Sequence, residues 1–149
     1  MTSIAFRSYS SADLEPCLRL FDNNCPTYFA PNERAEYQHF LRDGAPGYSV
    51  CEAESQIVGA FGLVQQSGIC RVQWIMISPH IQRAGLGTAM MNEALARARS
   101  GGARALLIAA SHKSAPFFAR FGARAVRDTP NGWGPGMHRI DMQLELDAG

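Results

Sequence analysis

The chain has 149 residues, a length typical of one domain with one hydrophobic core. Hydrophobic residues make up 46% of the chain, charged residues 18%, and the formal net charge is +1. This balance argues against a nucleic-acid surface, which needs a basic excess, and the sequence has no apolar run of the roughly 18 residues that a membrane helix requires. We therefore expect a single domain over residues 1–149, with no nucleic-acid or membrane partner. The start of the sequence lacks the apolar stretch of a signal peptide, so the expected compartment is the cytoplasm.

The first half of the chain is expected to form one strand, two helices and three further strands. Residues 4–9 predict a short strand, and a capping box at Ser10–Asp13, followed by apolar residues at helical spacing, predicts a helix. A second helix is expected over about residues 32–41, before Asp43-Gly44. Segments rich in β-forming residues, joined by short polar links that favour antiparallel hairpins, lie at 48–53, 57–64 and 71–77.

The second half begins with a glycine corner and a helix that ends near Ser100, before Gly101-Gly102. An unbroken apolar strand follows at 105–110, as expected for a strand covered on both faces. Ser114-Ala115-Pro116 opens a short helix. Two last strands, separated by a loop rich in proline and glycine at 130–136, are expected at 124–129 and 139–146.

The order of these elements predicts the fold class. A strand, a glycine turn, a helix and a strand form a βαβ crossover, so the strands that end at Ile77 and begin at Ala105 should be parallel. The other neighbours are expected to be antiparallel. The chain should therefore have an α/β fold of the α+β type, with a mixed, mostly antiparallel sheet of about seven strands, one parallel central pair and about four flanking helices.

The four cysteines predict no metal site. Cys17, Cys25, Cys51 and Cys70 form no C-x-x-C pair and no zinc-finger spacing with histidine. Reduced thiols in the core are the expected state, and no metal is expected.

The glycine corner Gln82-Arg83-Ala84-Gly85-Leu86-Gly87 predicts an anion site. At a helix N-terminus the first backbone amides lack partners and the helix dipole is positive, and glycines let a phosphate approach the backbone. A Walker loop is absent, and a Rossmann turn is disfavoured because methionine stands at the third small-residue position. A turn that merely joins strand to helix is the plain alternative.

The chain resembles the GNAT-type acyl-CoA N-acyltransferases. Gln82–Gly87 matches their signature [QR]-x-x-G-x-[GA], and Ile77-Ser78-Pro79 is similar to the strand end that precedes it. Phe117–Ala123 is similar to the family's later aromatic helix and Gly-containing segment, and the order of elements matches over nearly the whole chain. The resemblance implies the GNAT fold.

The resemblance also implies how acetyl-CoA, the expected acyl donor, is bound. The strands that end at Ile77 and begin at Ala105 should splay apart, and the pantetheine arm should pair with the backbone of Ile75, Met76 and Ile77, beside Ser114 and Phe118. Backbone amides that hold the pyrophosphate are expected at Gln82, Arg83, Ala84, Gly85, Leu86, Gly87, Thr88 and Ala89.

The family's usual mechanism is direct attack of an amine on the acetyl carbonyl. It needs a neutral amine, a backbone N–H near Met76 for the developing negative charge, and an acid for the departing thiolate. Phe118 stands where the family often has a tyrosine acid, and a phenyl ring cannot donate a proton. Ser111, His112 and Ser114 are the candidates for contact with the thiol end. Helix capping is the alternative for the serines, and a solvated loop is the alternative for His112.

Glu33 is the candidate general base, because it lies in the helical pair that covers the acceptor site in the family. Glu52 and Gln73 are weaker candidates on central strands, and a structural or solvated role is the alternative for all three. Aromatic residues in loops that would wall the acceptor slot, or else cover the edge of the core, are Tyr28, Phe29 and Trp133.

These observations predict an N-acetyltransferase that moves an acetyl group from acetyl-CoA to a primary amine of a small molecule or protein in a ternary complex. The absent tyrosine keeps open a second interpretation, a non-catalytic acyl-CoA-binding module that regulates a partner protein. A nucleotide-dependent oxidoreductase is a third and would be stabilised by NAD instead. A homodimer is among the expected assemblies, because dimers are common in proteins of this size and type.

Overall fold

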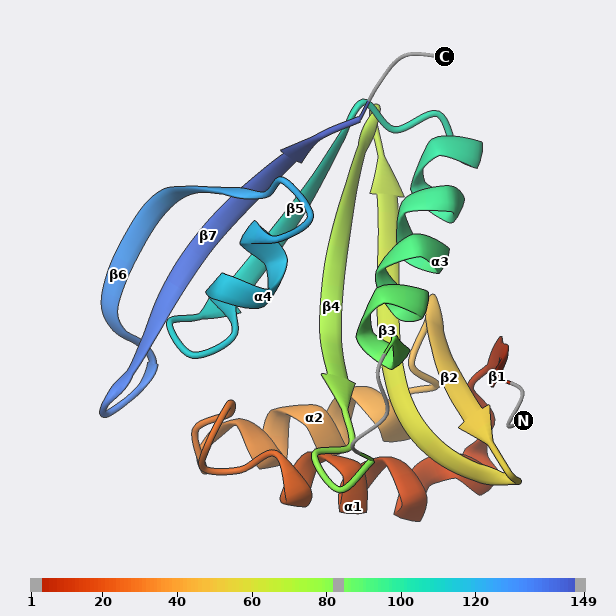
Figure 1. Ribbon diagram of the computed structural model, residues 1–149. Helices are drawn as coiled ribbons and strands as arrows, with labels where there is room; N and C mark the ends of the chain where they lie inside the picture. Colours follow the sequence, from red (N-terminus) through yellow and green to blue (C-terminus); the bar gives the residue numbers. More distant parts are fainter. Residues whose placement is uncertain (1–3, 82–84, 147–149) are drawn as a thin grey trace.

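The computed structural model describes residues 4–81 and 85–146 and contains one mixed β-sheet (Figure 1). The strand order is β1-β2-β3-β4-β5-β7-β6. The strands are β1 (Ile4–Ser8), β2 (Tyr48–Ala53), β3 (Gln56–Gln66), β4 (Ile69–Ile77), β5 (Ala105–Ser111), β6 (Arg124–Gly134) and β7 (Met137–Glu145). Within the described residues β4 and β5 form the one parallel pair, and the other neighbours are antiparallel, which confirms the predicted fold class.

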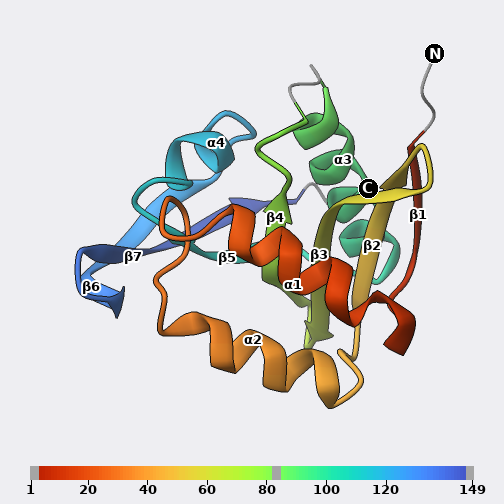
Figure 2. The ribbon, with the colours of Figure 1, turned by 90° about the horizontal axis from the view of Figure 1, so that it is seen from below.

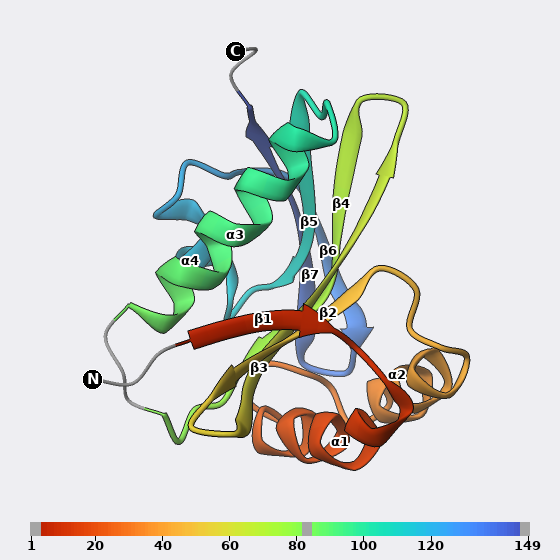
Figure 3. The same cartoon turned by 90° about the vertical axis from the view of Figure 1, so that its right-hand side faces the viewer.

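Helices cover both faces of the sheet. The α-helices are α1 (Leu14–Asn23), α2 (Glu33–Arg42), α3 (Leu86–Ser100) and α4 (Ala115–Ala119). Figures 2 and 3 show α1 and α2 on one side of the sheet and α3 on the other, and in Figure 2 α4 lies on the same side as α3. None of the helices in the described part of the chain is long and apolar enough to cross a membrane.

The predicted capping box forms at the start of the first helical segment. The backbone N–H of Ser10 donates to Asp13 Oδ2 at 2.9 Å, and the Arg7 guanidinium pairs with the same carboxylate at 2.8 Å. These bonds tie the end of β1 to α1 and lower the pKa of Asp13, chiefly through the hydrogen bond from Arg7.

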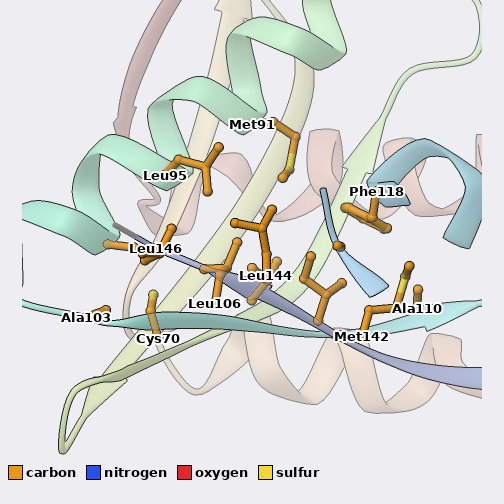
Figure 4. Close-up of a cluster of buried hydrophobic side chains, with 14 residues drawn as sticks. Cys70, Met91, Leu95, Ala103, Leu106, Ala110, Phe118, Met142, Leu144 and Leu146 are labelled. Atoms are coloured by element: carbon orange, nitrogen blue, oxygen red, sulfur yellow. The ribbon is translucent and has the colours of Figure 1, made fainter. Parts of the chain in front are cut away.

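Two large apolar clusters hold the layers together. Figure 4 shows the first, in which Met91 and Leu95 of α3 and Phe118 of α4 pack on Leu106 of β5 and Leu144 of β7. The second lies under α1 and α2. Its buried side chains include Cys17, Phe21, Tyr37, Leu41, Val50 and Met76. All four cysteines are free thiols, as predicted, and Cys25 is half-buried while the other three are buried.

A bulge in β4 separates this strand from β5. The β4–β5 ladder runs from Ile69↔Ala105 to Val72↔Ile108, and no later pair follows among the residues that the structure describes. On its other side β4 shifts register against β3, so that Trp74 and Ile75 together lie opposite one residue. Figure 1 shows β4 and β5 close at one end and far apart at the end near α1.

Trp74 itself occupies an unusual backbone conformation, with φ at 48°. The Tyr48 hydroxyl donates to the Trp74 carbonyl oxygen at 2.7 Å and lies 2.8 Å from the Tyr37 hydroxyl. The Trp74 ring packs against Phe29, Tyr37 and Phe40, with ring centroids 5.0–6.4 Å apart. Contacts from β2, α2 and the segment between α1 and α2 therefore hold the bulge.

The prediction of a loop at 130–136 is wrong for most of these residues. β6 continues to Gly134, which pairs with Met137, after an irregularity that begins at Thr129. Pro130 lies between the pairs Thr129↔Arg139 and Gly134↔Met137, in the irregular part of an edge strand, which is a position where proline is tolerated. Trp133 is therefore held by a strand. The bounds of the other elements differ from the predicted ones by one or two residues.

We predict that Tyr48→Phe lowers the free energy of unfolding by about 1–3 kcal/mol, because it removes the hydroxyl that donates to the half-buried Trp74 carbonyl and that pairs with the buried Tyr37 hydroxyl. Tyr28→Phe makes the same chemical change at a side chain that is 40% exposed, and it should change stability by less than about 0.5 kcal/mol. Urea denaturation measures both. Equal effects of the two substitutions would contradict the role given to Tyr48.

Candidate active site

The splayed ends of β4 and β5 enclose a cavity of about 590 Å³. Its floor is β4 from Val72 onward, one wall is β5 from Ile108 to Ser111, and α4 and the segment between α1 and α2 supply the rest. Of the predicted site residues, those that line it are Tyr28, Phe29, Glu33, Gln73, Ile75, Met76, Ile77, Ser111, Ser114, Phe118 and Trp133. The structure thus brings together residues that are far apart in the sequence.

The backbone of β4 presents polar groups to this cavity. Ser78 N–H donates to Val58 O at 2.8 Å, and the register pairs Met76 with Ala60. Antiparallel strands alternate between hydrogen-bonded and non-bonded pairs, so the backbone N–H and C=O of Met76 are directed at β3. The peptide groups of Ile75 and Ile77 are directed the other way, into the gap. The N–H expected near Met76 for a developing negative charge is therefore better supplied by Ile77 or Ile75.

The N-terminus of α3 lies at the end of β4 beyond the cavity. Gly85 caps the helix with φ at 94°, and a Cβ there would meet no atom within 4 Å. Helix geometry leaves the N–H groups of Leu86, Gly87 and Thr88 without partners in the helix, while Ala89 N–H already donates to Gly85 O at 2.8 Å. The free amides are thus fewer than predicted. Gln82, Arg83 and Ala84 lie outside the described residues.

Gly87 has a packing role at the same corner. A Cβ at this position would lie 2.8 Å from Cε1 of Phe117 and 3.3 Å from Cδ1 of Ile77. The missing side chain lets α3 approach α4 and the end of β4. Phe117 also lines the cavity, so the helix N-terminus and the cavity share a wall.

Ser111 and Ser114 hold the turn between β5 and α4. Ser114 N–H donates to Ser111 Oγ, and Ser111 N–H donates to Ser114 Oγ, both at 3.1 Å. The two hydroxyl oxygens are also 3.1 Å apart. The capping alternative is therefore realised, and because both residues line the cavity, contact with a thiol stays a prediction.

His112 is directed away from the cavity. Its Nδ1 accepts the backbone N–H of His138 at 3.1 Å, and its ring centroid is 4.6 Å from that of His138. His112 follows the end of β5 in a turn and does not line the cavity, whereas its neighbour Ser111 does. The structure gives the predicted catalytic role of His112 no contact to support it.

Glu33 places a carboxyl group in the cavity wall. The residue is 4% exposed, and Oε2 accepts the backbone N–H of Ala30 at 2.8 Å. Burial raises the pKa of Glu33 to about 7, and the nearby Glu36 adds to the rise. Among the described residues Glu33 forms no ion pair. Glu52, by contrast, pairs with Arg7 at the β1 edge and does not line the cavity.

Aromatic side chains form much of the acceptor end of the cavity. Phe29 stacks on Trp74 with ring centroids 6.2 Å apart. Trp133 donates its indole N–H to Ala110 O at 3.0 Å. Phe118 is 3% exposed and packs in the core, so its ring closes the cavity on the α4 side.

Several residues of the cavity wall were not predicted as site residues, among them Asn24, Lys113 and Phe117. Asn24 is 4% exposed and donates its side-chain amide to Leu20 O at 2.8 Å, and nothing in its sequence context marks it. Lys113 is exposed and stands between the predicted residues Ser111 and Ser114, which is a usable signal. Phe117 was noted only as part of a motif. No group of three or more His, Cys, Asp or Glu within residues 4–81 and 85–146 is arranged to hold a metal ion.

The chain matches the model of the acetyltransferase (GNAT) domain over residues 21–146, and it belongs to the GNAT acetyltransferase family. Membership of this family supports an acyltransferase. Among proteins with a curated function, none matches this chain.

Solved structures show the same fold. A protein assigned to the GNAT acetyltransferases from Desulfovibrio desulfuricans is 25% identical, with a TM-score of 0.79 over 97% of this chain and 100% of that chain. The ribosomal-protein-S18-alanine N-acetyltransferase from Escherichia coli is 15% identical, with a TM-score of 0.77 over 100% of this chain and 96% of that chain. PaiA N-acetyltransferase from Thermoplasma acidophilum, solved with coenzyme A, is 14% identical, with a TM-score of 0.73 over 96% and 99%.

We predict that the Glu33 carboxyl titrates near pH 7 in the folded protein, well above its ordinary 4.5. Because the folded pKa is raised, its contribution to stability is complete below about pH 4.5 and is lost as the pH rises through about 7. Between about pH 5.5 and about pH 8 the wild type should therefore lose about 2 kcal/mol relative to Glu33→Gln, which cannot ionise.

Urea denaturation of both proteins at the two pH values measures this difference, and carbon NMR of the carboxyl group gives the midpoint directly. A midpoint below about pH 5, with parallel pH profiles for the two proteins, would contradict the burial argument.

Proposed function

We propose that this protein transfers an acetyl group from acetyl-CoA to a primary amine of a small molecule or protein, directly and in a ternary complex. One observation carries the proposal. The cavity between β4 and β5 shares Phe117 with the free N-terminus of α3 at one end and contains the carboxyl group of Glu33 at the other. These two features fit an anionic donor and a cationic acceptor, respectively.

The N-terminus of α3 fits the pyrophosphate of the donor. The N–H groups of Leu86, Gly87 and Thr88 and the positive end of the helix dipole favour an anion. The open space beside Gly85 lets phosphate oxygens approach these groups. Gln82, Arg83 and Ala84 precede them in the sequence and would extend the same anion site. The coenzyme A in the PaiA structure supports this choice of donor.

The gap between the strands fits the pantetheine arm, which carries amides on an otherwise apolar chain. The peptide groups of Ile75 and Ile77 face the gap and would pair with those amides as a neighbouring strand does. Ile108, Phe117 and Phe118 supply apolar wall. The arm would therefore direct the thioester toward the Glu33 end of the cavity.

Glu33 is the proposed general base. An alkylammonium has a pKa near 10 and must lose a proton before its nitrogen can attack. A carboxylate whose pKa is about 7 accepts that proton more readily than an ordinary carboxylate does, directly or through one water. Ile77 or Ile75 would donate a backbone N–H to the acetyl oxygen as negative charge develops there.

The site does not need a tyrosine to release coenzyme A. A thiol with a pKa of about 8.5 leaves as thiolate near neutral pH. Phe118 supplies apolar wall where the family often has that tyrosine. The Ser111 and Ser114 hydroxyls are the polar side-chain groups at the β5 end that would meet the sulfur.

The test is the rate of thiol release from acetyl-CoA with a panel of primary amines. We predict that kcat/KM rises with pH through about 7, because Glu33 must be ionised to accept a proton. Glu33→Gln should lower kcat/KM by about a hundredfold or more and remove this rise. Glu15→Gln makes the same change on an exposed position of α1, and it should change kcat/KM less than about threefold.

Two results would overturn the assignment. Unchanged kinetics in Glu33→Gln would remove Glu33 from the base role. Calorimetric binding of acetyl-CoA without thiol release on any amine would favour the acyl-CoA-binding module instead.

A further inference from the structure

Among the described residues that line the cavity, Glu33 is the one acidic side chain. Glu33 is buried, lines the cavity and accepts one hydrogen bond, from Ala30 N–H. A buried carboxylate is stable only with a cationic or hydrogen-bonding partner, and the described residues offer Glu33 no cation. An ammonium group on the acceptor would supply this partner.

The rest of the wall does not suit a second positive charge. Lys113 is the one basic side chain among the described residues that line the cavity. A polyamine that placed one ammonium at Glu33 would bring further ammonium groups into contact with this lysine or with aromatic and aliphatic side chains. Both environments disfavour them, the first by repulsion and the second by desolvation.

Aromatic side chains line the cavity together with Glu33. Phe29 and Trp133 line the same cavity, from the α1–α2 segment and from β6. The Trp133 indole is fixed by its hydrogen bond to Ala110 O, and the Arg139 guanidinium covers the ring at 4.9 Å from its centroid. Fixed flat surfaces of this kind bind a flat apolar group at little cost in side-chain entropy.

The chain also bridges this end of the cavity. The side-chain amide of Asn32 donates to Trp133 O at 2.8 Å. A Cβ at Gly134 would overlap Asn32 Oδ1 and lie 2.8 Å from Ala30 Cβ, so β6 and the α1–α2 segment are in direct contact. A polypeptide acceptor would have to break these contacts, whereas a small molecule would not.

We propose that the acceptor is a small primary monoamine with an aromatic or similarly flat apolar body, its ammonium group at Glu33 and its body against Trp133 and Phe29. This inference rests on the proposed acetyl transfer and specifies its substrate class. Trp133 is then the residue that determines specificity, through contact with the part of the substrate that does not react.

The test compares four acceptors with acetyl-CoA: 2-phenylethylamine, ethylamine, spermidine and a short peptide with a free N-terminal amine. An apolar group that fills a pocket changes kcat/KM by about 10–200-fold. The kcat/KM for 2-phenylethylamine should therefore exceed that for each of the other three acceptors by about tenfold or more. Trp133→Ala should lower kcat/KM for 2-phenylethylamine about tenfold more than for ethylamine.

Two further variants keep the comparison interpretable. Trp133→Phe retains an aromatic face and should preserve most of the preference for 2-phenylethylamine even if Trp133→Ala does not fold. Val126→Ala truncates a side chain on the same strand that is 51% exposed, and it should leave the ratio between the two amines unchanged.

The outcomes separate this inference from the proposed function. Faster turnover of spermidine or of the peptide, or an equal loss for both monoamines in Trp133→Ala, would overturn the substrate class and leave acetyl transfer intact. Thiol release with none of the amines would overturn acetyl transfer and this inference together.

Discussion

The hydrogen bond from the Tyr48 hydroxyl to the Trp74 carbonyl, at 2.7 Å, holds the feature on which the site depends. A bulky residue at φ 48° costs about 1–3 kcal/mol, so the bulge persists only because its surroundings enforce it. The hydroxyl of Tyr48 and the rings of Phe29, Tyr37 and Phe40 do so. The bulge ends the β4–β5 ladder, and the resulting gap becomes a cavity with peptide groups on one wall.

Burial in the wall of this cavity raises the pKa of Glu33. This residue begins α2, where the helix dipole stabilises a carboxylate by about 0.3–1 kcal/mol and lowers its pKa. A pKa of about 7 in place of 4.5 corresponds to about 3 kcal/mol in the opposite direction, so desolvation outweighs the dipole. The apolar surroundings that suit an apolar substrate thus also give the Glu33 carboxyl group a pKa suited to proton transfer near neutral pH.

Local patterns predicted the parts of the site that depend on local chemistry. The glycines predicted the turn before α3, and the order of the elements predicted the parallel pair. The family resemblance predicted that Glu33 lies near the acceptor site. The bulge could not be predicted, because Trp74 adopts its backbone conformation through Tyr48, which is distant in the sequence. His112 was expected in the site, but it lies in the turn after β5, where its ring contacts His138 of β7. Trp133 was expected in a loop, but β6 continues to Gly134, so Trp133 lies in a strand.

The most direct test of the bulge is NMR-resolved hydrogen exchange of the β4 amides, with and without acetyl-CoA. Met76 N–H is paired with β3, whereas Ile77 N–H faces the gap. Our prediction is that the Ile77 N–H exchanges faster than the Met76 N–H in the free protein and that its exchange slows by about tenfold or more when acetyl-CoA is added. Equally slow exchange of both amides, unchanged by the ligand, would contradict it.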